Sequence, residues 1–313
     1  MASETEGAAT PLPESKPAAD PNAPRELVYR ASDGLKLFAR DYGDPVSPNV
    51  PVVCLAGLTR TSRDFHELAL RLSTDPERPR RVVAFDYRGR GRSSDDRNTD
   101  NYNPLTEMND AVDGMSALGV TRAIVVGTSR GGIIALLMGV ARPAMLAGLV
   151  LNDIGPVIEA RGLARIKTYV GRMPAPETWD DAVALMRRLH GAQFTALTDA
   201  GWQAWTRLSW RDDNGHPAGD YDPALAETLD GIEFDKPMPN LWNEFRALSP
   251  RLPVMAIRGE NSDLLTAATV AAMGEAHPGM QTVTVAGEGH APLLRGPVIE
   301  RIATFAAGVD VSR

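Results

Sequence analysis

The sequence predicts an α/β protein with a mostly parallel sheet of eight strands, helices on both faces of the sheet, and an inserted helical cap. Short apolar runs alternate with helical patterns from residue 27 to residue 151. This rhythm breaks between about residues 154 and 250 and resumes at Val254. Strands separated by helices pair in parallel, and strands that are apolar on both sides fit a sheet covered on both faces.

The first two strands form a hairpin, because Asp33-Gly34 between two alternating runs is a strong turn signal. The expected strands are residues 27–30, 35–39, 50–55, 81–86, 123–126, 146–151, 254–258 and 282–285. The expected helices are residues 64–72, 106–118, 133–140 and 267–275, with a closing helix from Val298. This order gives one layered core, residues 25–153 and 251–313, interrupted by a single insertion.

The insertion, residues 154–250, is helical and irregular and is expected to cover the carboxyl ends of the strands as a cap. All five tryptophans of the chain lie in it. Ligand sites are mostly apolar and favour such interfaces, so Trp202, Trp205 and Trp210 are candidates for a substrate pocket, whereas ordinary packing of a small subdomain is the alternative.

Composition narrows the classes of function. The net charge of −7 over 313 residues argues against a general nucleic-acid or anionic-membrane surface. No run is long and apolar enough to span a membrane, and residues 1–24 read as a disordered tail without a secretion signal. The single cysteine, Cys54, cannot form an internal disulfide. We expect a cytoplasmic protein, and the sequence does not indicate its oligomeric state.

One motif carries chemistry. The β-branched run 123–126 ends in Gly127-Thr128-Ser129-Arg130-Gly131 and passes directly into a helical pattern. A strand that reverses into a helix within a few residues strains the residue at the apex, and glycines on both sides remove Cβ atoms that would clash. Ser129 is therefore predicted to project its hydroxyl from the sheet edge as a nucleophile, although such a serine can also be a plain helix cap.

A serine hydroxyl needs a base, and that base needs an orienting acid. Of the five histidines, His290 follows the last strand in Gly287-Glu288-Gly289-His290, on the edge that bears Ser129. The preferred acid is Asp263, in the loop after the strand 254–258, and Asp153 and Glu260 remain alternatives. The backbone N–H groups of Leu58 and Arg130 are the expected donors to an oxyanion.

These motifs resemble those of cap-bearing α/β-hydrolases related to carboxylesterases, lactonases and carbon–carbon bond hydrolases. The resemblance covers the chain from about Leu27 onward. It rests on Gly57-Leu58-Thr59-Arg60, on Asp86-Tyr87-Arg88-Gly89-Arg90-Gly91-Arg92-Ser93, on Gly127 to Gly132, and on Asp263 and Gly289-His290. In such proteins the turn 86–93 is structural. The family often has a histidine where this chain has Ala56, and this departure makes Leu58 a weaker assignment than Arg130.

The resemblance implies a serine hydrolase that acts on carboxylic esters or lactones of small to medium size through an acyl-enzyme. Hydrolysis of a carbon–carbon bond in a diketone-like substrate, acyl transfer or perhydrolysis, and a weakly active ligand receptor remain as alternatives. The histidines are scattered, and neither a phosphate loop nor a dinucleotide fingerprint is present, so we expect no metal and no cofactor.

Overall fold

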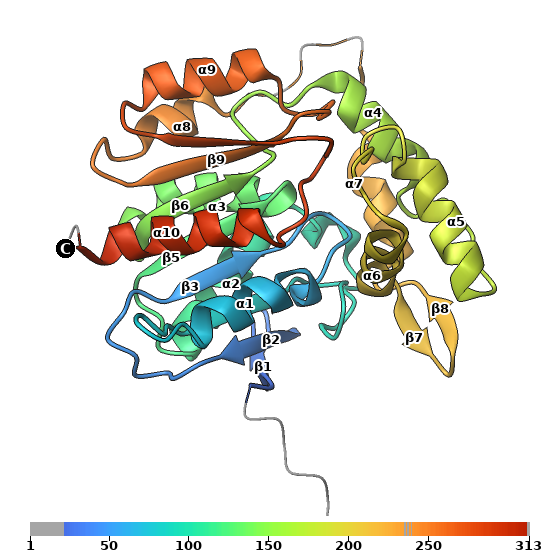
Figure 1. Cartoon of the computed structure of the whole chain (residues 1–313). Helices are drawn as coiled ribbons and strands as arrows, with labels where there is room; N and C mark the ends of the chain where they lie inside the picture. The colour runs from blue at the N-terminus through green and yellow to red at the C-terminus, as the bar shows by residue number, and fades with distance from the viewer. Residues whose placement is uncertain (1–21, 235, 237, 239, 312–313) are drawn as a thin grey trace, which may run out of the picture.

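The computed structural model describes residues 22–311 except 235, 237 and 239, and the predicted tail lies outside these residues as far as residue 21. A single sheet runs through the core in the order β1-β2-β4-β3-β5-β6-β9-β10 (Figure 1). Its strands are β1 (Arg25–Arg30), β2 (Lys36–Tyr42), β3 (Val52–Leu55), β4 (Val82–Asp86), β5 (Ala123–Thr128), β6 (Leu146–Asn152), β9 (Val254–Gly259) and β10 (Gln281–Val285). Strand β2 is antiparallel to both of its neighbours, β1 and β4, and the other strand pairs are parallel, so the predicted fold class is confirmed.

Helices cover both faces of this sheet (Figure 1). Helices α1 (His66–Ser73) and α10 (Pro297–Val311) lie together on one face. Helices α2 (Pro104–Ala117), α3 (Arg130–Ala141) and α8 (Trp242–Ala247) lie on the other, and α9 (Ala267–Ala276) lies against β9. Short 3-10 turns span Ser62–Phe65, Thr99–Asn101, Pro143–Met145 and Pro223–Ala226.

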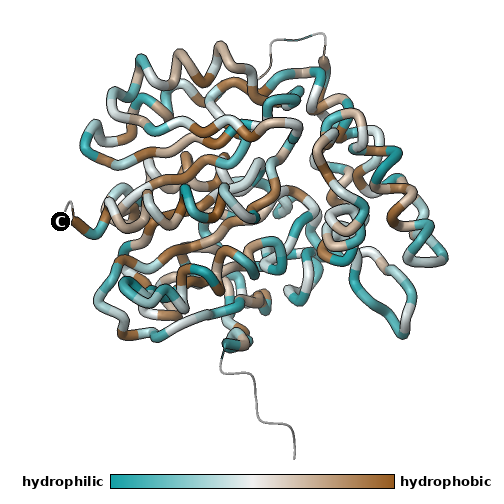
Figure 2. Tube along the Cα trace, in the orientation of Figure 1, coloured by the Kyte–Doolittle hydropathy of each residue, from teal (hydrophilic) through white to brown (hydrophobic). Residues whose placement is uncertain are grey.

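The core follows from the apolar strands. Every residue of β3, β4 and β6 is buried, and the strands stand out as brown segments in Figure 2. Helix α2 begins where the sequence supplies a cap, because the Asn103 side chain accepts hydrogen bonds from two backbone amides and Pro104 follows it.

The inserted segment forms a separate layer over the sheet edge, at the right of Figure 1. It contains α4 (Ala160–Tyr169), α5 (Trp179–His190), α6 (Asp199–Ser209), the exposed hairpin β7 (Arg211–Asp213) and β8 (His216–Ala218), and α7 (Glu227–Asp230). The two ends of this segment meet: Val157 pairs with Asn240 in an isolated bridge, and Leu241 N donates to Pro156 O at 2.7 Å.

Residues 154–250 are predicted to form this insertion. Within that range, α8 packs on α3 of the core, so we propose that the insertion ends before α8.

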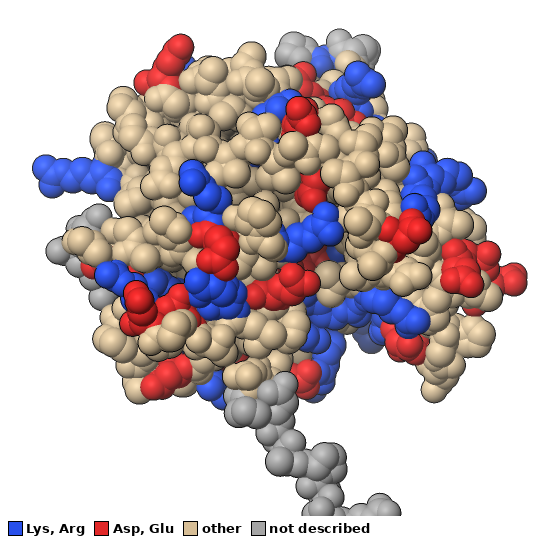
Figure 3. Space-filling view, in the orientation of Figure 1, with Lys and Arg blue, Asp and Glu red and all other residues tan. Residues whose placement is uncertain are grey.

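The surface carries both charges. Figure 3 shows Lys and Arg side chains interspersed with Asp and Glu over the face drawn. Among residues 22–311, with the three gaps given above, no helix is long and apolar enough to cross a membrane.

Candidate active site

The turn between β5 and α3 holds Ser129 in a left-handed conformation, with φ 51° and ψ −115°. The flanking glycines are required by close approach. A Cβ at Gly127 would lie 2.5 Å from Gly131 O, and a Cβ at Gly131 would lie 2.0 Å from Leu55 O. The strained turn expected from the sequence is thus present, with Ser129 immediately before the first residue of α3.

His290 reaches Ser129 from the loop that follows β10. Its Nε2 lies 2.8 Å from Ser129 Oγ, within hydrogen-bonding distance. Asn152 links the two segments that carry this pair, because its Nδ2 donates to Thr128 Oγ1 at 3.1 Å and to Pro292 O at 3.0 Å. The geometry that the sequence predicted for this pair is what base-assisted attack by a hydroxyl requires.

The carboxylate bound to His290 is that of Asp153, not Asp263. His290 Nδ1 lies 2.8 Å from Asp153 Oδ2. Asp153 is fully buried, and its carboxylate also accepts from Gly259 N at 2.7 Å and from Ser262 Oγ at 2.5 Å. Three donors hold this carboxylate in one orientation, which suits a group that orients a histidine.

Asp263, the acid preferred from the sequence, is bound elsewhere. Its two carboxylate oxygens accept from Arg165 of α4, at 2.7 Å from Nε and 3.0 Å from Nη2. Burial is the largest single influence and acts to raise the pKa of Asp263, but hydrogen bonds from Arg165 and Gln193, together with the nearby charges of Arg165 and His290, hold this pKa below its ordinary value. Asp263 therefore joins the loop after β9 to the insertion.

Glu260, the third candidate, supports the histidine loop from a distance. Its Oε2 accepts from Gly287 N at 2.8 Å, so the side chain anchors the turn that leads to His290. The signal available for Asp153 was its position immediately after the apolar run 146–151 and Asn152, at the end of a strand. An acid there lies at the sheet edge itself, whereas Asp263 is four residues beyond the end of β9.

The two expected oxyanion donors lie beside the serine. Arg130 is the first residue of α3, where a backbone N–H has no partner inside the helix. Leu58 lies in the loop after β3 and lines the same cavity as Ser129. A Cβ built on Gly57 would lie 3.9 Å from Ser129 Cβ, so this loop passes close to the hydroxyl.

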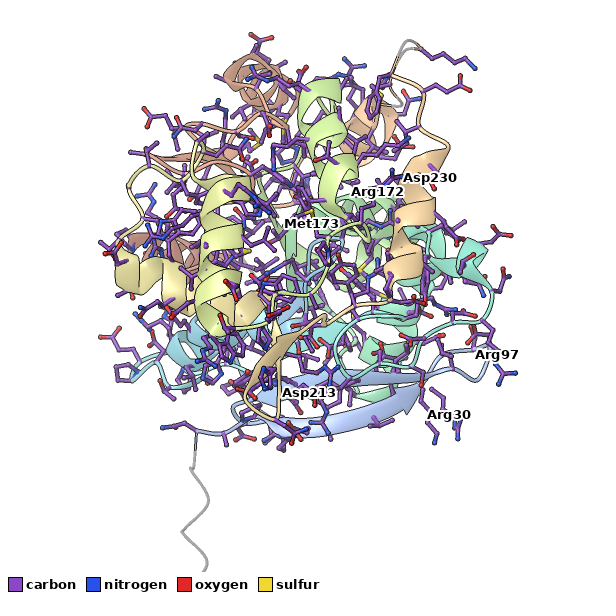
Figure 4. The ribbon with its side chains drawn as sticks, turned by 90° about the vertical axis from the view of Figure 1, so that its right-hand side faces the viewer. Arg30, Arg97, Arg172, Met173, Asp213 and Asp230 are labelled. Atoms are coloured by element: carbon purple, nitrogen blue, oxygen red, sulfur yellow. The ribbon has the colours of Figure 1, made fainter. Side chains whose placement is uncertain are left out.

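A cavity of about 700 Å³ opens above Ser129 and His290, between the sheet edge and the insertion. Its lining from the insertion includes Met173, Met186, Trp205 and Trp210. Figure 4 looks at the insertion from outside, with Met173 near the centre of the view and Asp213 below it at the hairpin. The lining is mostly apolar, as in sites for small organic molecules.

Two of the three tryptophan predictions agree with this lining. Trp205 and Trp210 line the cavity, whereas Trp202 does not. Trp202 packs against Trp205, with ring centroids 5.5 Å apart, and against Phe194 at 6.5 Å. It is part of a small buried cluster inside the insertion, which was the alternative reading for these residues.

His190, at the end of α5, is a cavity residue that the sequence did not single out. Its ring lies 5.0 Å from that of Trp205 and 5.6 Å from that of Tyr169. Its buried Nδ1 has no hydrogen-bond partner among the described residues. Burial, assisted by the nearby positive charges of Arg165 and Arg60, lowers the pKa of His190 to about 3. The insertion thus contributes a neutral imidazole to the cavity.

This pKa predicts an acid-sensitive fold. Below its ordinary pKa of 6.5, His190 binds a proton in the unfolded chain but not in the folded one, so stability falls as the pH falls from about 6.5 toward 3. We expect a loss of about 2 kcal/mol between pH 7.5 and pH 5 from this group. Urea denaturation of wild type and His190→Gln at both pH values measures it. Equal losses in the two proteins would contradict the assignment.

Among the residues described, no group of three or more His, Cys, Asp or Glu side chains is placed to hold a metal ion.

The fold and this line of side chains define a hydrolase class, and comparison with known proteins agrees. The sequence model of the alpha/beta hydrolase family matches residues 52–300. The chain belongs to the α/β hydrolase family.

The relatives are hydrolases. The chain is 32% identical to the 3-hydroxybutyrate-oligomer hydrolase of Cupriavidus necator over 84% of this chain and 89% of that protein. It is 27% identical to the 2-(acetamidomethylene)succinate hydrolase of Mesorhizobium japonicum over 75% of this chain and 79% of that protein. A crystal structure of an alpha/beta hydrolase from Novosphingobium aromaticivorans covers 91% of this chain and 98% of its own, with a TM-score of 0.83 and 34% identity.

Proposed function

We propose that this protein is a serine hydrolase that cleaves carboxylic esters through an acyl-enzyme on Ser129. The observation that carries the proposal is the continuous hydrogen-bonded line from Ser129 Oγ through His290 to the buried Asp153. A hydroxyl activated in this way attacks a carbonyl carbon, and the acyl group is then released by water.

Each group has a defined task in this reaction. His290 Nε2 takes the proton from Ser129 as the hydroxyl attacks, and returns it to the leaving alkoxide. Asp153 holds the imidazole by Nδ1 and stabilises its positive charge while it carries that proton. The backbone N–H groups of Leu58 and Arg130 stabilise the negative oxygen of the tetrahedral intermediate. In the second half of the cycle, His290 activates water against the acyl-enzyme by the same proton transfers.

The cavity supports a small or medium-sized ester with apolar flanks. Methionine, leucine and tryptophan side chains are among those that line its roof, and about 700 Å³ accommodates a chain of a few ester units. The relationship to a 3-hydroxybutyrate-oligomer hydrolase supports linear oligoesters of short hydroxy acids as the first substrates to examine.

Turnover of four substrate types tests the reaction class: p-nitrophenyl esters of increasing acyl length, a linear 3-hydroxybutyrate trimer, a δ-lactone, and a vinylogous diketone. We expect ester turnover, and rapid acid quenching followed by peptide mass spectrometry is expected to find an acyl group on Ser129. Turnover of the diketone without ester turnover would indicate a carbon–carbon bond hydrolase. Fluorophosphonate labelling that depends on both Ser129 and His290 would argue against a ligand receptor.

A further inference from the structure

Arg90, in the turn that the sequence marks only as structural, contacts the loop beside Ser129. Its side chain is buried, with a relative exposure of 1%. Its Nε donates to Leu58 O at 2.8 Å, and its Nη1 donates to Arg88 O at 2.7 Å. Arg90 thus fixes the backbone of the residue whose N–H is one of the two proposed oxyanion donors.

Arg130 carries the second proposed donor, and its side chain is also held. Its Nη2 donates to Tyr102 O at 2.9 Å. Its Nε lies 2.7 Å from Oε2 of Glu107, on the neighbouring helix α2. The other carboxylate oxygen of Glu107, Oε1, lies 2.8 Å from Nη1 of Arg90. One carboxylate therefore bridges the two arginines, and its own exposure is 0%.

We propose that Glu107 is a positioning residue that holds the two oxyanion donors at a fixed separation, through Arg90 on the Leu58 side and through Arg130 on the other. The inference rests on the proposed function, since the donors matter only for a reaction that develops an oxyanion. Donors stabilise such a charge only if they are placed before the reaction begins. The Arg90–Glu107–Arg130 bridge provides that placement, because it holds both donor residues without contacting the reacting atoms.

The charges explain why a carboxylate is needed here. Two guanidinium groups and one carboxylate leave a buried cluster with one net positive charge. Without the carboxylate, two like charges would lie close together in a medium that screens them poorly. Their repulsion would displace Leu58 O and the start of α3, and a displacement of about 1 Å at a catalytic group can cost about 100-fold in rate.

Glu107→Gln tests the inference, with Asp110→Asn as its matched control. Asp110 lies one turn further along α2, is also buried, and pairs with Arg88 of the same turn, Nη2 to Oδ1 at 2.6 Å. Neither Asp110 nor Arg88 contacts Leu58 or Arg130 through a side-chain bond. Both substitutions replace a buried carboxylate that pairs with an arginine of the turn 86–93.

The measurements are kcat and KM for a p-nitrophenyl ester and Ki for a trifluoromethyl ketone, which forms a charged tetrahedral adduct with a serine. For Glu107→Gln we expect kcat to fall by about 30- to 100-fold, Ki to rise by a similar factor, and KM to change by less than about threefold. For Asp110→Asn we expect kcat and Ki to stay within about threefold of wild type.

A result in which Glu107→Gln and Asp110→Asn change kcat and Ki alike would overturn the inference. If Glu107→Gln does not fold, Arg130→Gln replaces it, because it cuts one arm of the bridge and keeps the Glu107–Arg90 pair. An unchanged Ki in Arg130→Gln would then overturn the inference. A wild-type protein that neither hydrolyses esters nor binds the ketone would instead refute the proposed function, so the two failures are distinguishable.

Discussion

Replacing Asp153 with asparagine is expected to lower kcat for ester hydrolysis by about 10³- to 10⁴-fold, with little change in KM. The amide cannot stabilise a positively charged His290, and it can present an N–H to Nδ1, which favours the wrong tautomer of the imidazole. Steady-state kinetics on the best p-nitrophenyl ester measures the effect. Because Asp153 also binds Gly259 N and Ser262 Oγ, circular dichroism and urea denaturation should confirm that the variant is folded.

Asp263→Asn is the matched comparison, since it makes the same chemical change at the acid that the sequence favoured. Its carboxylate binds Arg165 at 2.7 and 3.0 Å, so kcat is expected to stay within about fivefold of wild type. A large loss in Asp263→Asn together with a small loss in Asp153→Asn would reverse the assignment of the orienting acid.

Replacing Ser129 with alanine is expected to have the largest effect of all, a fall in kcat of about 10⁵- to 10⁶-fold. The substitution removes only the hydroxyl oxygen, and alanine meets the same backbone strain at φ 51°, so the fold and the cavity should persist. Residual turnover would come from the oxyanion donors and from substrate binding alone. Kinetics at high enzyme concentration and labelling by a fluorophosphonate probe measure the loss.

Ser116→Ala is the control for this variant, because Ser116 is an exposed serine on α2 whose hydroxyl donates to Val112 O within the helix. We expect it to keep full turnover and full labelling. Ser129→Ala that retained turnover in a folded protein would show that the acyl-enzyme is not formed at this residue.

Much of the fold could be predicted because it depends on local patterns. Apolar strands such as Val82–Asp86 are stable only when both faces of the sheet are covered. The pair Gly127 and Gly131 predicts a sharp turn from strand to helix, because a side chain at either position would clash. Because the carboxyl ends of parallel strands share one edge, Ser129 and His290 could be placed together, and their atoms lie 2.8 Å apart.

The acid could not be chosen in the same way, because the choice depends on tertiary contacts. Asp153 turns its carboxylate toward His290 from a left-handed backbone position, with φ 54°, which no residue pattern announced. The carboxylate of Asp263 binds Arg165, which lies in helix α4 of the insertion and is 98 positions away from Asp263 in the chain. The end of the insertion depends on tertiary contacts in the same way, because the apolar residues of α8 could pack on either layer, and they pack on α3.

The meeting of the chain at Pro156 and Leu241 has a consequence for protein engineering. The chain leaves the core and returns to it at this one place, and Ser129, His290 and Asp153 all lie in the core outside the inserted segment. The segment between Pro156 and Leu241 can therefore be exchanged as one unit for the corresponding segment of a related enzyme, by joining the chains at these two residues. Such grafts would alter which molecules are admitted while the apparatus beneath them stays in place.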